Sequence, residues 1–172
     1  MTKLLLSDSR LFFNQIPMYY WIMSQKLYGP FFHGGTWDGA KPIKIGKGAL
    51  GIGAYFTPDI ERAKEYAKAK NGLIIQAYLE LNNPLLIEMK SNERGWLEGH
   101  PCIVALVQLG MKYDKATKKV EKTEEEKGYM GKEISTLAMK QGYDSLMIAR
   151  DGTLSEVVIW NSNKVFQTQM IS

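Results

Sequence analysis

The sequence predicts an α+β fold in a single domain, and three observations support this prediction. Short apolar runs of strand length recur along the chain, bounded by glycine, proline and asparagine. Helical patterns lie between some of these runs, without the regular strand–helix alternation of a parallel, doubly wound sheet. The 172 residues, 45% hydrophobic and 23% charged, are enough for one compact core rather than two. We therefore expect residues 1–172 to form one α+β domain.

Residues 1–28 predict an N-terminal helical extension. Apolar side chains fall on several faces over residues 9–27, so one or two short helices are expected there, ended by Gly29 and Pro30. The apolar run over residues 16–23 is too short to span a bilayer, and it lacks a basic leader and a small-residue cleavage site. The sequence thus predicts a cytoplasmic protein with no signal peptide and no membrane contact.

The next part of the chain predicts two short strands and a helix. A buried strand that runs into a turn is expected over residues 31–36, a glycine-rich loop over 37–53, and a second strand over 54–56. Thr57 is a suitable N-cap and is followed by a proline, which suits the first helical position. A helix is therefore expected from there to about Lys70, closed by an Asn-Gly pair.

The rest of the chain predicts further strands and helices in a mixed order. Strands are expected over residues 73–81, 85–87, 145–148, 156–160 and 165–170. Helices are expected over residues 101–111 and 133–140, and residues 112–127 predict a solvated loop or helix face because they are dense in both signs of charge. A turn over residues 150–152 joins two of the strands.

His33 and Gly34 are the first candidate site residues. His33 ends an apolar strand run, where a histidine is either buried as a structural residue or turned toward a ligand. Gly34 favours the ligand, because without a side chain its N–H and C=O can approach an amide closely. Gly48, Gly51 and Gly53 predict only a turn, since no phosphate-binding glycine motif follows them.

Tyr55, Tyr66 and Glu156 are the other candidates. Each tyrosine alone suits a hydrophobic core, but two rings brought together can enclose a flat cation such as a pyridinium. A cation over such a ring gains about 0.5–2 kcal/mol. Glu156 precedes a wholly apolar run, so its carboxylate either ends a strand in solvent or points into a site.

Metal and disulfide chemistry have little support in the sequence. Cys102 is the single cysteine, and His33 and His100 are the two histidines, so we expect no disulfide framework and no metal site. The net charge of +4 and the pI near 9.0 suit either a soluble surface or a polyanionic partner.

Three blocks in order resemble the ADP-ribosyltransferase superfamily, in the His-Tyr-Glu branch shared by diphtheria-toxin-like enzymes and poly(ADP-ribose) polymerases. The blocks are Phe32-His33-Gly34, residues 51–57 with Ala63 and Tyr66 downstream, and residues 154–160 around Glu156. Asn-Pro-Leu within residues 79–85 and Gly-Tyr-Asp within 142–145 make the chain most similar to small domains of phages and mobile elements. The resemblance covers residues 30–167 and implies a split β-sheet core with flanking helices.

The resemblance also implies a role for each candidate residue, with NAD as the substrate. The implied NAD-binding residues are His33, Gly34, Thr36, Tyr55 and Tyr66. Among them, the histidine would bind a ribose hydroxyl, the glycine backbone would hold the carboxamide, and the two tyrosines would enclose the nicotinamide ring.

The implied catalytic residues are Glu156, His33 and Tyr55, with Glu156 stabilising the cationic ribose. Ala63 departs from the polymerases, which commonly carry a serine at this position. No metal is implied.

The resemblance predicts an enzyme that transfers ADP-ribose from NAD to a protein or nucleic acid and releases nicotinamide. Two alternatives stay open: an NAD glycohydrolase toxin, and a catalytically silent module that binds a nucleotide or a partner protein. RNA 2′-phosphotransferases are distant relatives in fold, but their histidine- and arginine-rich site is not visible here. An antitoxin or regulatory partner is also expected, and Lys41, Lys44 and Lys47 are hypothesised to flank the acceptor site.

Overall fold

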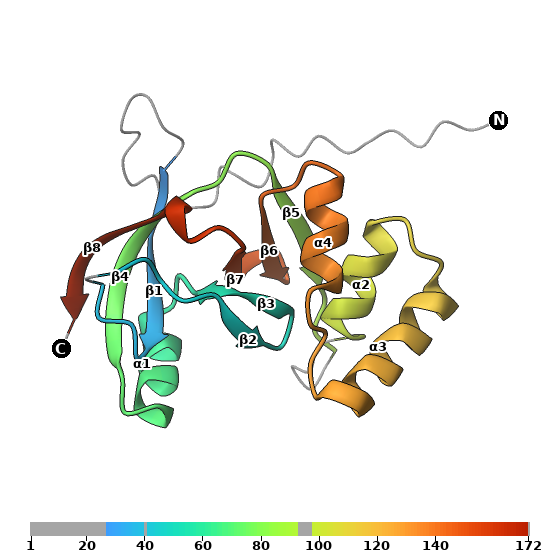
Figure 1. Cartoon of the computed structure of the whole chain (residues 1–172), viewed down its shortest axis with the longest axis horizontal. Helices are drawn as coiled ribbons and strands as arrows, with labels where there is room; N and C mark the ends of the chain where they lie inside the picture. The colour runs from blue at the N-terminus through green and yellow to red at the C-terminus, as the bar shows by residue number, and fades with distance from the viewer. Residues whose placement is uncertain (1–26, 40, 93–97, 172) are drawn as a thin grey trace.

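The computed structural model describes residues 27–39, 41–92 and 98–171 (Figure 1). The strands are β1 (Leu27–Gly35), β2 (Gly46–Gly48), β3 (Gly51–Phe56), β4 (Leu73–Glu80), β5 (Pro84–Met89), β6 (Ser145–Arg150), β7 (Thr153–Ile159) and β8 (Val165–Ile171). The helices are α1 (Ile60–Ala69), α2 (Pro101–Gln108), α3 (Tyr113–Lys127) and α4 (Glu133–Lys140), with a 3-10 turn over Ser162–Lys164. The predicted helical extension lies outside the described residues except for Leu27 and Tyr28, which belong to β1 and not to a helix.

The strands form two sheets that meet at one bridge. A three-stranded antiparallel sheet has the order β1-β4-β8, and a five-stranded sheet has the order β2-β3-β7-β6-β5, in which β5 and β6 run parallel. Phe32 of β1 and Thr57, just after β3, exchange backbone hydrogen bonds of 2.8 and 2.9 Å. The fold is therefore α+β with a split sheet, as the sequence predicts.

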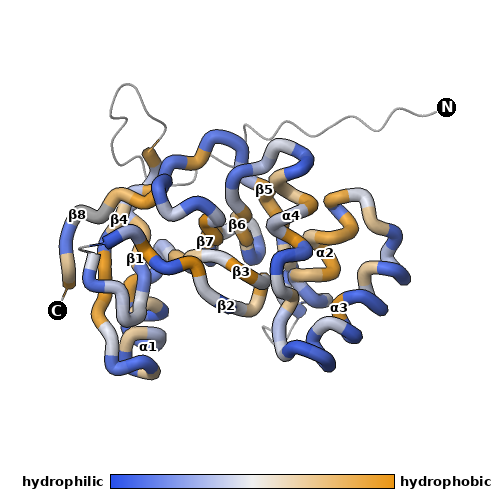
Figure 2. Tube along the Cα trace, in the orientation of Figure 1, coloured by the Kyte–Doolittle hydropathy of each residue, from blue (hydrophilic) through white to orange (hydrophobic). Residues whose placement is uncertain are grey.

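The five-stranded sheet lies between two different layers. Val158 and Leu146 pack toward α2, α3 and α4, whereas Val157 and Met147, one position along the same strands, pack toward the three-stranded sheet. Helix α1 covers the other face of the three-stranded sheet, where Ala63 packs with Ile74 and Phe32 (Figure 1). Figure 2 shows the hydrophobic stretches along the strands and α2, and the hydrophilic stretches along α1 and α3.

Helix α1 approaches β1 at backbone distance. A Cβ atom at Gly34 would collide with the carbonyl oxygen of Ala63 and would lie 2.8 Å from the backbone nitrogen of Ala67. Both alanines are buried against the strand. Gly34 is thus required for this packing, whatever it also does toward a ligand.

The predicted loop over residues 37–53 is wrong at its C-terminal end, because β2 and the first half of β3 form a hairpin there. The glycines that suggested a loop are small for packing reasons. A side chain at Gly53 would collide with Val158 of the neighbouring strand, and one at Gly48 would collide with the ring of Tyr55.

The predicted N-cap of α1 is also wrong by two residues. Asp59 caps the helix, since its Oδ1 accepts hydrogen bonds from the N–H groups of Glu61 at 2.9 Å and Arg62 at 3.5 Å. The backbone of Thr57 is held extended by its bridge to Phe32, so it cannot begin the helix. The end of α1 near Lys70 agrees with the prediction.

The remaining elements agree with the predictions, with small shifts of their ends. The stretch left open as loop or helix face is helix α3, which buries Ala116, Val120 and Thr123 along one side. The turn between β6 and β7 has positive φ at Asp151 and Gly152, as a tight hairpin turn requires. Within the described residues, no helix has both the length and the apolar character to cross a membrane.

The Asn-Pro-Leu and Gly-Tyr-Asp blocks hold each other together. The N–H of Asn82 donates to Asp144 Oδ2 at 2.8 Å, and the amide of Asn83 donates to the carbonyl of Gly142 at 3.0 Å. Lys164 completes the cluster by donating to Asp144 Oδ2 at 2.9 Å. Burial opposes ionisation of Asp144, but hydrogen bonds from Lys164, the N–H of Asn82 and Ser145 lower the pKa of its carboxyl below the usual value. These two blocks therefore fix the parallel entry of β5 beside β6.

Candidate functional site

The candidate residues gather where the two sheets part. Strand β3 pairs with β7 as far as Phe56, which lies opposite Val157, and then turns to bridge β1 at Thr57. Glu156 is the next residue of β7, so it stands at the position where β3 has left its neighbour. Helix α1 begins three residues after the bridge, which brings its first two turns toward the same position.

Glu156 and Tyr55 lie on one face of the five-stranded sheet. Tyr55 is opposite Val158, and Glu156 is two residues from Val158 along β7, so the alternation of side chains places both on the same side. Burial raises the pKa of the Glu156 carboxyl, and the nearby Arg62 guanidinium opposes this shift. The structure thus brings the predicted acid and the predicted aromatic wall together, on a partly buried surface.

The Tyr55 ring is fixed by the β2–β3 turn. Its hydroxyl accepts a hydrogen bond from the N–H of Leu50 at 3.0 Å and donates one to the carbonyl oxygen of Gly51 at 2.8 Å. Burial raises the pKa of Tyr55 far above its usual value, and the charge of Glu156 adds to this. Tyr55 therefore stays a neutral phenol whose hydroxyl is already used, so its role at a site is limited to the ring.

Tyr66 stands near Tyr55 but does not stack on it within the part of the chain that the structure describes. Tyr66 is 45% exposed and its hydroxyl is hydrogen-bonded to Arg62, one helical turn earlier on α1. The proximity of the two tyrosines still raises the pKa of Tyr55 slightly. A slot between two rings is thus compatible with the arrangement, with Tyr66 as its outer and more open wall.

Arg62 is the functional candidate that the sequence analysis missed. Burial lowers the pKa of Arg62, but the hydrogen bond with Tyr66 and the charge of Glu156 raise it above the usual value. The guanidinium therefore favours the ionised form of Glu156 and holds the Tyr66 side chain. The signal in the sequence was its place four residues before Tyr66, on the same face of a helix.

One ring nitrogen of His33, Nε2, has no hydrogen-bond partner among the described residues. Its Nδ1 lies 2.8 Å from the carbonyl oxygen of Tyr55, and a carbonyl can only accept, so Nδ1 carries the proton. Burial lowers the pKa of His33, which keeps the ring neutral at pH 7 and leaves Nε2 as a hydrogen-bond acceptor. The ring is held between Phe56, at a centroid distance of 5.6 Å, and Trp37, at 6.2 Å.

Gly34 directs its peptide groups away from β4. The N–H and C=O of Phe32 point to Thr57 on that side, and two residues later along an antiparallel strand the groups point the same way. Gly34 thus offers a donor and an acceptor beside α1, where a planar amide could bind both. Thr36 follows β1 and is exposed, and nothing in the described residues ties it to the other candidates.

Three side chains of types that bind metal ions lie together near Tyr55, a group that the sequence analysis did not predict. Ligand atoms of His100, Cys102 and Glu124 lie within 4.8 Å of one another. Each already has a hydrogen-bond partner: His100 Nδ1 accepts from the N–H of Cys102 at 3.2 Å, His100 Nε2 is 3.3 Å from Glu124 Oε1, and the thiol donates to Ala49 at 3.2 Å. Burial raises the pKa of Cys102 to about 12, so the thiol is protonated. We interpret the group as a tie between α2, α3 and the β2–β3 turn.

Comparison with known proteins adds three findings. A family model described as "ADP-Ribosyltransferase in polyvalent proteins" matches residues 29–168. No curated protein matches the chain. Among solved structures, the crystal structure of an anti-CRISPR protein is similar over 83% of this chain and 95% of that chain, with 16% sequence identity and a TM-score of 0.38.

Proposed function

The chain belongs to the ADP-ribosyltransferase family of polyvalent proteins, and we propose that it cleaves NAD, releases nicotinamide and transfers ADP-ribose to a macromolecular acceptor. Members of such families use NAD as the substrate. The observation that carries the proposal is the meeting of Glu156, Tyr55 and Arg62 where the sheets part, beside the open peptide edge of Gly34. Each of these groups suits one part of NAD.

The reaction requires stabilisation of a positive charge on the ribose more than protonation of the leaving group. The C1′–N1 glycosidic bond of NAD breaks with its electron pair going to the nicotinamide nitrogen, which leaves as a neutral ring. Positive charge then develops on the ribose, as in the oxocarbenium-like state of glycoside hydrolysis. The acceptor nucleophile forms the new bond to C1′ and loses its proton.

Glu156 suits this step because its carboxylate lies on the same face of the sheet as the Tyr55 ring. An ionised Glu156 stabilises the ribose cation and accepts a hydrogen bond from the 2′-hydroxyl. Arg62 favours the ionised form against the effect of burial. Preorganised electrostatic groups of this kind are typically worth about 3–4 kcal/mol in the transition state.

The other residues position the substrate. The N–H and C=O of Gly34 bind the carboxamide, and the fixed Tyr55 ring covers one face of the nicotinamide. Tyr66 covers the other face, and the free Nε2 of His33 accepts a hydrogen bond from a ribose hydroxyl. Because His33 is neutral, it adds no charge that would compete with the developing cation.

The test is nicotinamide release from NAD labelled on its adenylate, with and without a bacterial lysate. Glu156→Gln keeps the shape of the side chain and should lower turnover by at least about a hundredfold. Glu88→Gln, at an exposed position of β5, is the matched control and should behave as wild type. A fall of less than tenfold for Glu156→Gln would remove the residue from catalysis.

The fate of the label separates transfer from hydrolysis. Label on a macromolecule, lost with protease or nuclease, supports the transferase. Label recovered only as free ADP-ribose, with release dependent on Glu156, makes the protein an NAD glycohydrolase. Absence of release under every condition contradicts both activities and favours a binding module.

A further inference from the structure

A hollow rich in lysine lies at the far end of strand β3. Its volume is about 740 Å³, and it is bounded by β3, α3, α4 and the segment between these helices. Four lysines and one glutamate line it, which leaves a net charge of +3: Lys115, Lys119, Lys127, Lys132 and Glu133. We refer to these five residues as the lysine pocket.

Most of the positive charge in the lysine pocket is not paired with a carboxylate of the described residues. Lys127 pairs with Glu133 at 3.5 Å. Among the residues that the structure describes, no carboxylate lies within 4.0 Å of the amines of Lys115, Lys119 or Lys132. Like charges gathered around one hollow repel one another, so they favour an anionic ligand.

The order of charges along α3 also indicates that the lysines of the pocket serve a ligand. Lys115 and Lys119 of the pocket lie in its first half, with Lys118 beside them but outside the pocket, and three consecutive glutamates, residues 124–126, lie in its last turn. A helix dipole favours the opposite order, with acids first and bases last. Asp114 and Lys127 follow the favoured order, but the main groups do not, so stability of the helix does not explain why the lysines stand at the pocket.

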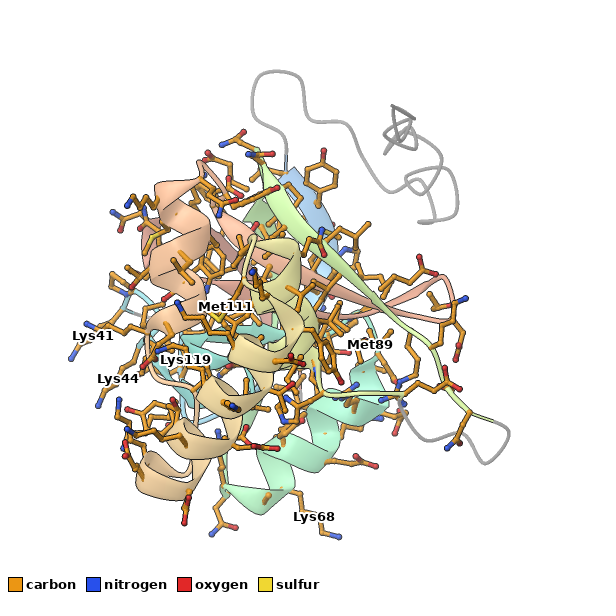
Figure 3. The ribbon with its side chains drawn as sticks, turned by 90° about the vertical axis from the view of Figure 1, so that its right-hand side faces the viewer. Lys41, Lys44, Lys68, Met89, Met111 and Lys119 are labelled. Carbon is orange, nitrogen blue, oxygen red and sulfur yellow. The ribbon has the colours of Figure 1, made fainter. Side chains whose placement is uncertain are left out.

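The lysine pocket is connected to the candidate site along β3. Ile52 lines the pocket and Tyr55 is three residues further on, about 10 Å at the usual rise of a strand, with the two side chains on opposite faces of β3. Lys47 of β2 lies with its amine 4.7 Å from the ring centroid of Tyr129, which also lines the pocket. Figure 3 shows Lys41 and Lys44 on the same side of the molecule as Lys119, with Lys68 away from them at the end of α1.

We propose that the lysine pocket binds the phosphates of a nucleic-acid strand, and that this strand is the acceptor of ADP-ribose. The inference rests on the proposed function for the transfer itself. Every basic side chain of the pocket is a lysine. Lysine contacts phosphate as a point charge and needs no fixed geometry, which suits sequence-independent contact with a phosphodiester chain. The regular charge of a phosphodiester chain therefore fits this surface.

Binding is measured without NAD, so that it does not depend on catalysis. A fluorescein-labelled single-stranded oligonucleotide of about 20 nucleotides exceeds common single-strand site sizes and serves as the probe. The pocket variant is Lys115→Glu, Lys119→Glu and Lys132→Glu together. The matched control is Lys68→Glu, Lys118→Glu and Lys140→Glu, which makes the same change of charge at exposed positions outside the pocket.

The pocket variant should bind the oligonucleotide at least tenfold more weakly, and the control variant should stay within threefold of wild type. The dependence of log affinity on log salt should become shallower by about 2, since three phosphate contacts to a single strand are lost. Circular dichroism melting of all three proteins shows that they are folded.

Transfer completes the test. With adenylate-labelled NAD and the oligonucleotide, the pocket variant should keep nicotinamide release but lose the label on the nucleic acid. Equal binding by pocket and control variants, a raised KM for NAD in the pocket variant alone, or label on protein rather than nucleic acid overturns the inference. Absence of nicotinamide release from wild type is a different failure, since it contradicts the proposed function and leaves the oligonucleotide measurement to decide the pocket.

Discussion

Helix α1 and the layer formed by α2, α3 and α4 cover their sheets in different ways. Helix α1 meets β1 through Gly34 and two alanines, with backbone against backbone. The other three helices meet the five-stranded sheet through large buried side chains such as Leu106, Val120 and Ile134. Contacts of the first kind fix position, and contacts of the second kind supply hydrophobic stabilisation. The candidate site lies beside the first kind, where Arg62 and Tyr66 depend on how closely α1 approaches.

The largest effect on stability is expected in the helical layer. Leu106→Ala removes a fully buried side chain and should lower the free energy of unfolding by about 2–5 kcal/mol, measured by urea denaturation. Nicotinamide release per folded molecule should change little, because Tyr55, which packs against the cluster that contains Leu106, is also held by the hydrogen bonds of its hydroxyl to the β2–β3 turn. A loss of more than threefold in kcat/KM in the folded variant would mean that this layer also positions the site. That result would contradict the proposed difference between α1 and the other three helices.

Gly34→Ala tests the close contact between α1 and β1. The added methyl group meets the Ala63 carbonyl, so α1 must move, at a cost of about 1–3 kcal/mol in unfolding free energy. Because Arg62 and Tyr66 move with the helix, KM for NAD should rise at least tenfold, measured by steady-state nicotinamide release. Gly46→Ala is the control, since a Cβ atom there meets no atom within 4 Å. A destabilised Gly34→Ala protein with an unchanged KM would separate the packing of α1 from the site.

The same division explains what could be predicted from the sequence. Strands and helices with a clear local pattern, such as α4, were predicted at their observed ends. The hairpin of β2 and β3 was missed, because Gly53 is small for its contact with Val158, which is distant in the sequence, and Gly48 is small for the ring of Tyr55 within the hairpin itself. The cap of α1 was misplaced for a similar reason, since the bridge between Thr57 and Phe32 is a long-range contact.

The candidate site was predicted only as separate blocks. Nothing local in the sequence indicates that Glu156 lies where β3 leaves β7, because this depends on the register of two strands that are about a hundred residues apart. Arg62 was missed because Glu156, the partner that places it at the site, is distant in the sequence, whereas its other partner, Tyr66, is only one helical turn away. The resemblance supplied an order of residues, and the structure adds the electrostatic contact between them.

Arg62→Ala is expected to have a smaller effect on activity than Gly34→Ala, and it tests how α1 acts on Glu156. Loss of the guanidinium removes what lowers the pKa of Glu156 and leaves the effect of burial, so this pKa should rise further. As the pH is lowered, the carboxylate is then protonated at a higher pH than in wild type, and activity that needs the ionised form is lost earlier. A pH profile of kcat/KM would show this as an acid limb shifted to higher pH. Arg62→Lys keeps the charge and should leave the limb near its wild-type position. An unchanged profile in Arg62→Ala would mean that the two charges do not interact.

Glu156→Gln should have the smallest effect on stability. Whether this substitution raises or lowers Tm shows whether Glu156 is a site residue or a residue that stabilises the fold. The pKa of Glu156 is raised in the folded protein, so the carboxyl stabilises the fold fully below its usual value of 4.5, and this contribution is lost as the pH rises through the raised value. At pH 7 the buried carboxylate thus opposes folding, and a neutral glutamine should raise Tm while it abolishes activity. The difference from wild type should shrink toward zero below pH 4.5, measured by thermal melts across the range. Glu88→Gln, exposed on β5, should show no such gain at any pH. A lower Tm for Glu156→Gln at pH 7 would mean that the carboxylate is held by bonds that stabilise the fold, and the residue would then belong with the structural contacts rather than with a site that is maintained at the expense of stability.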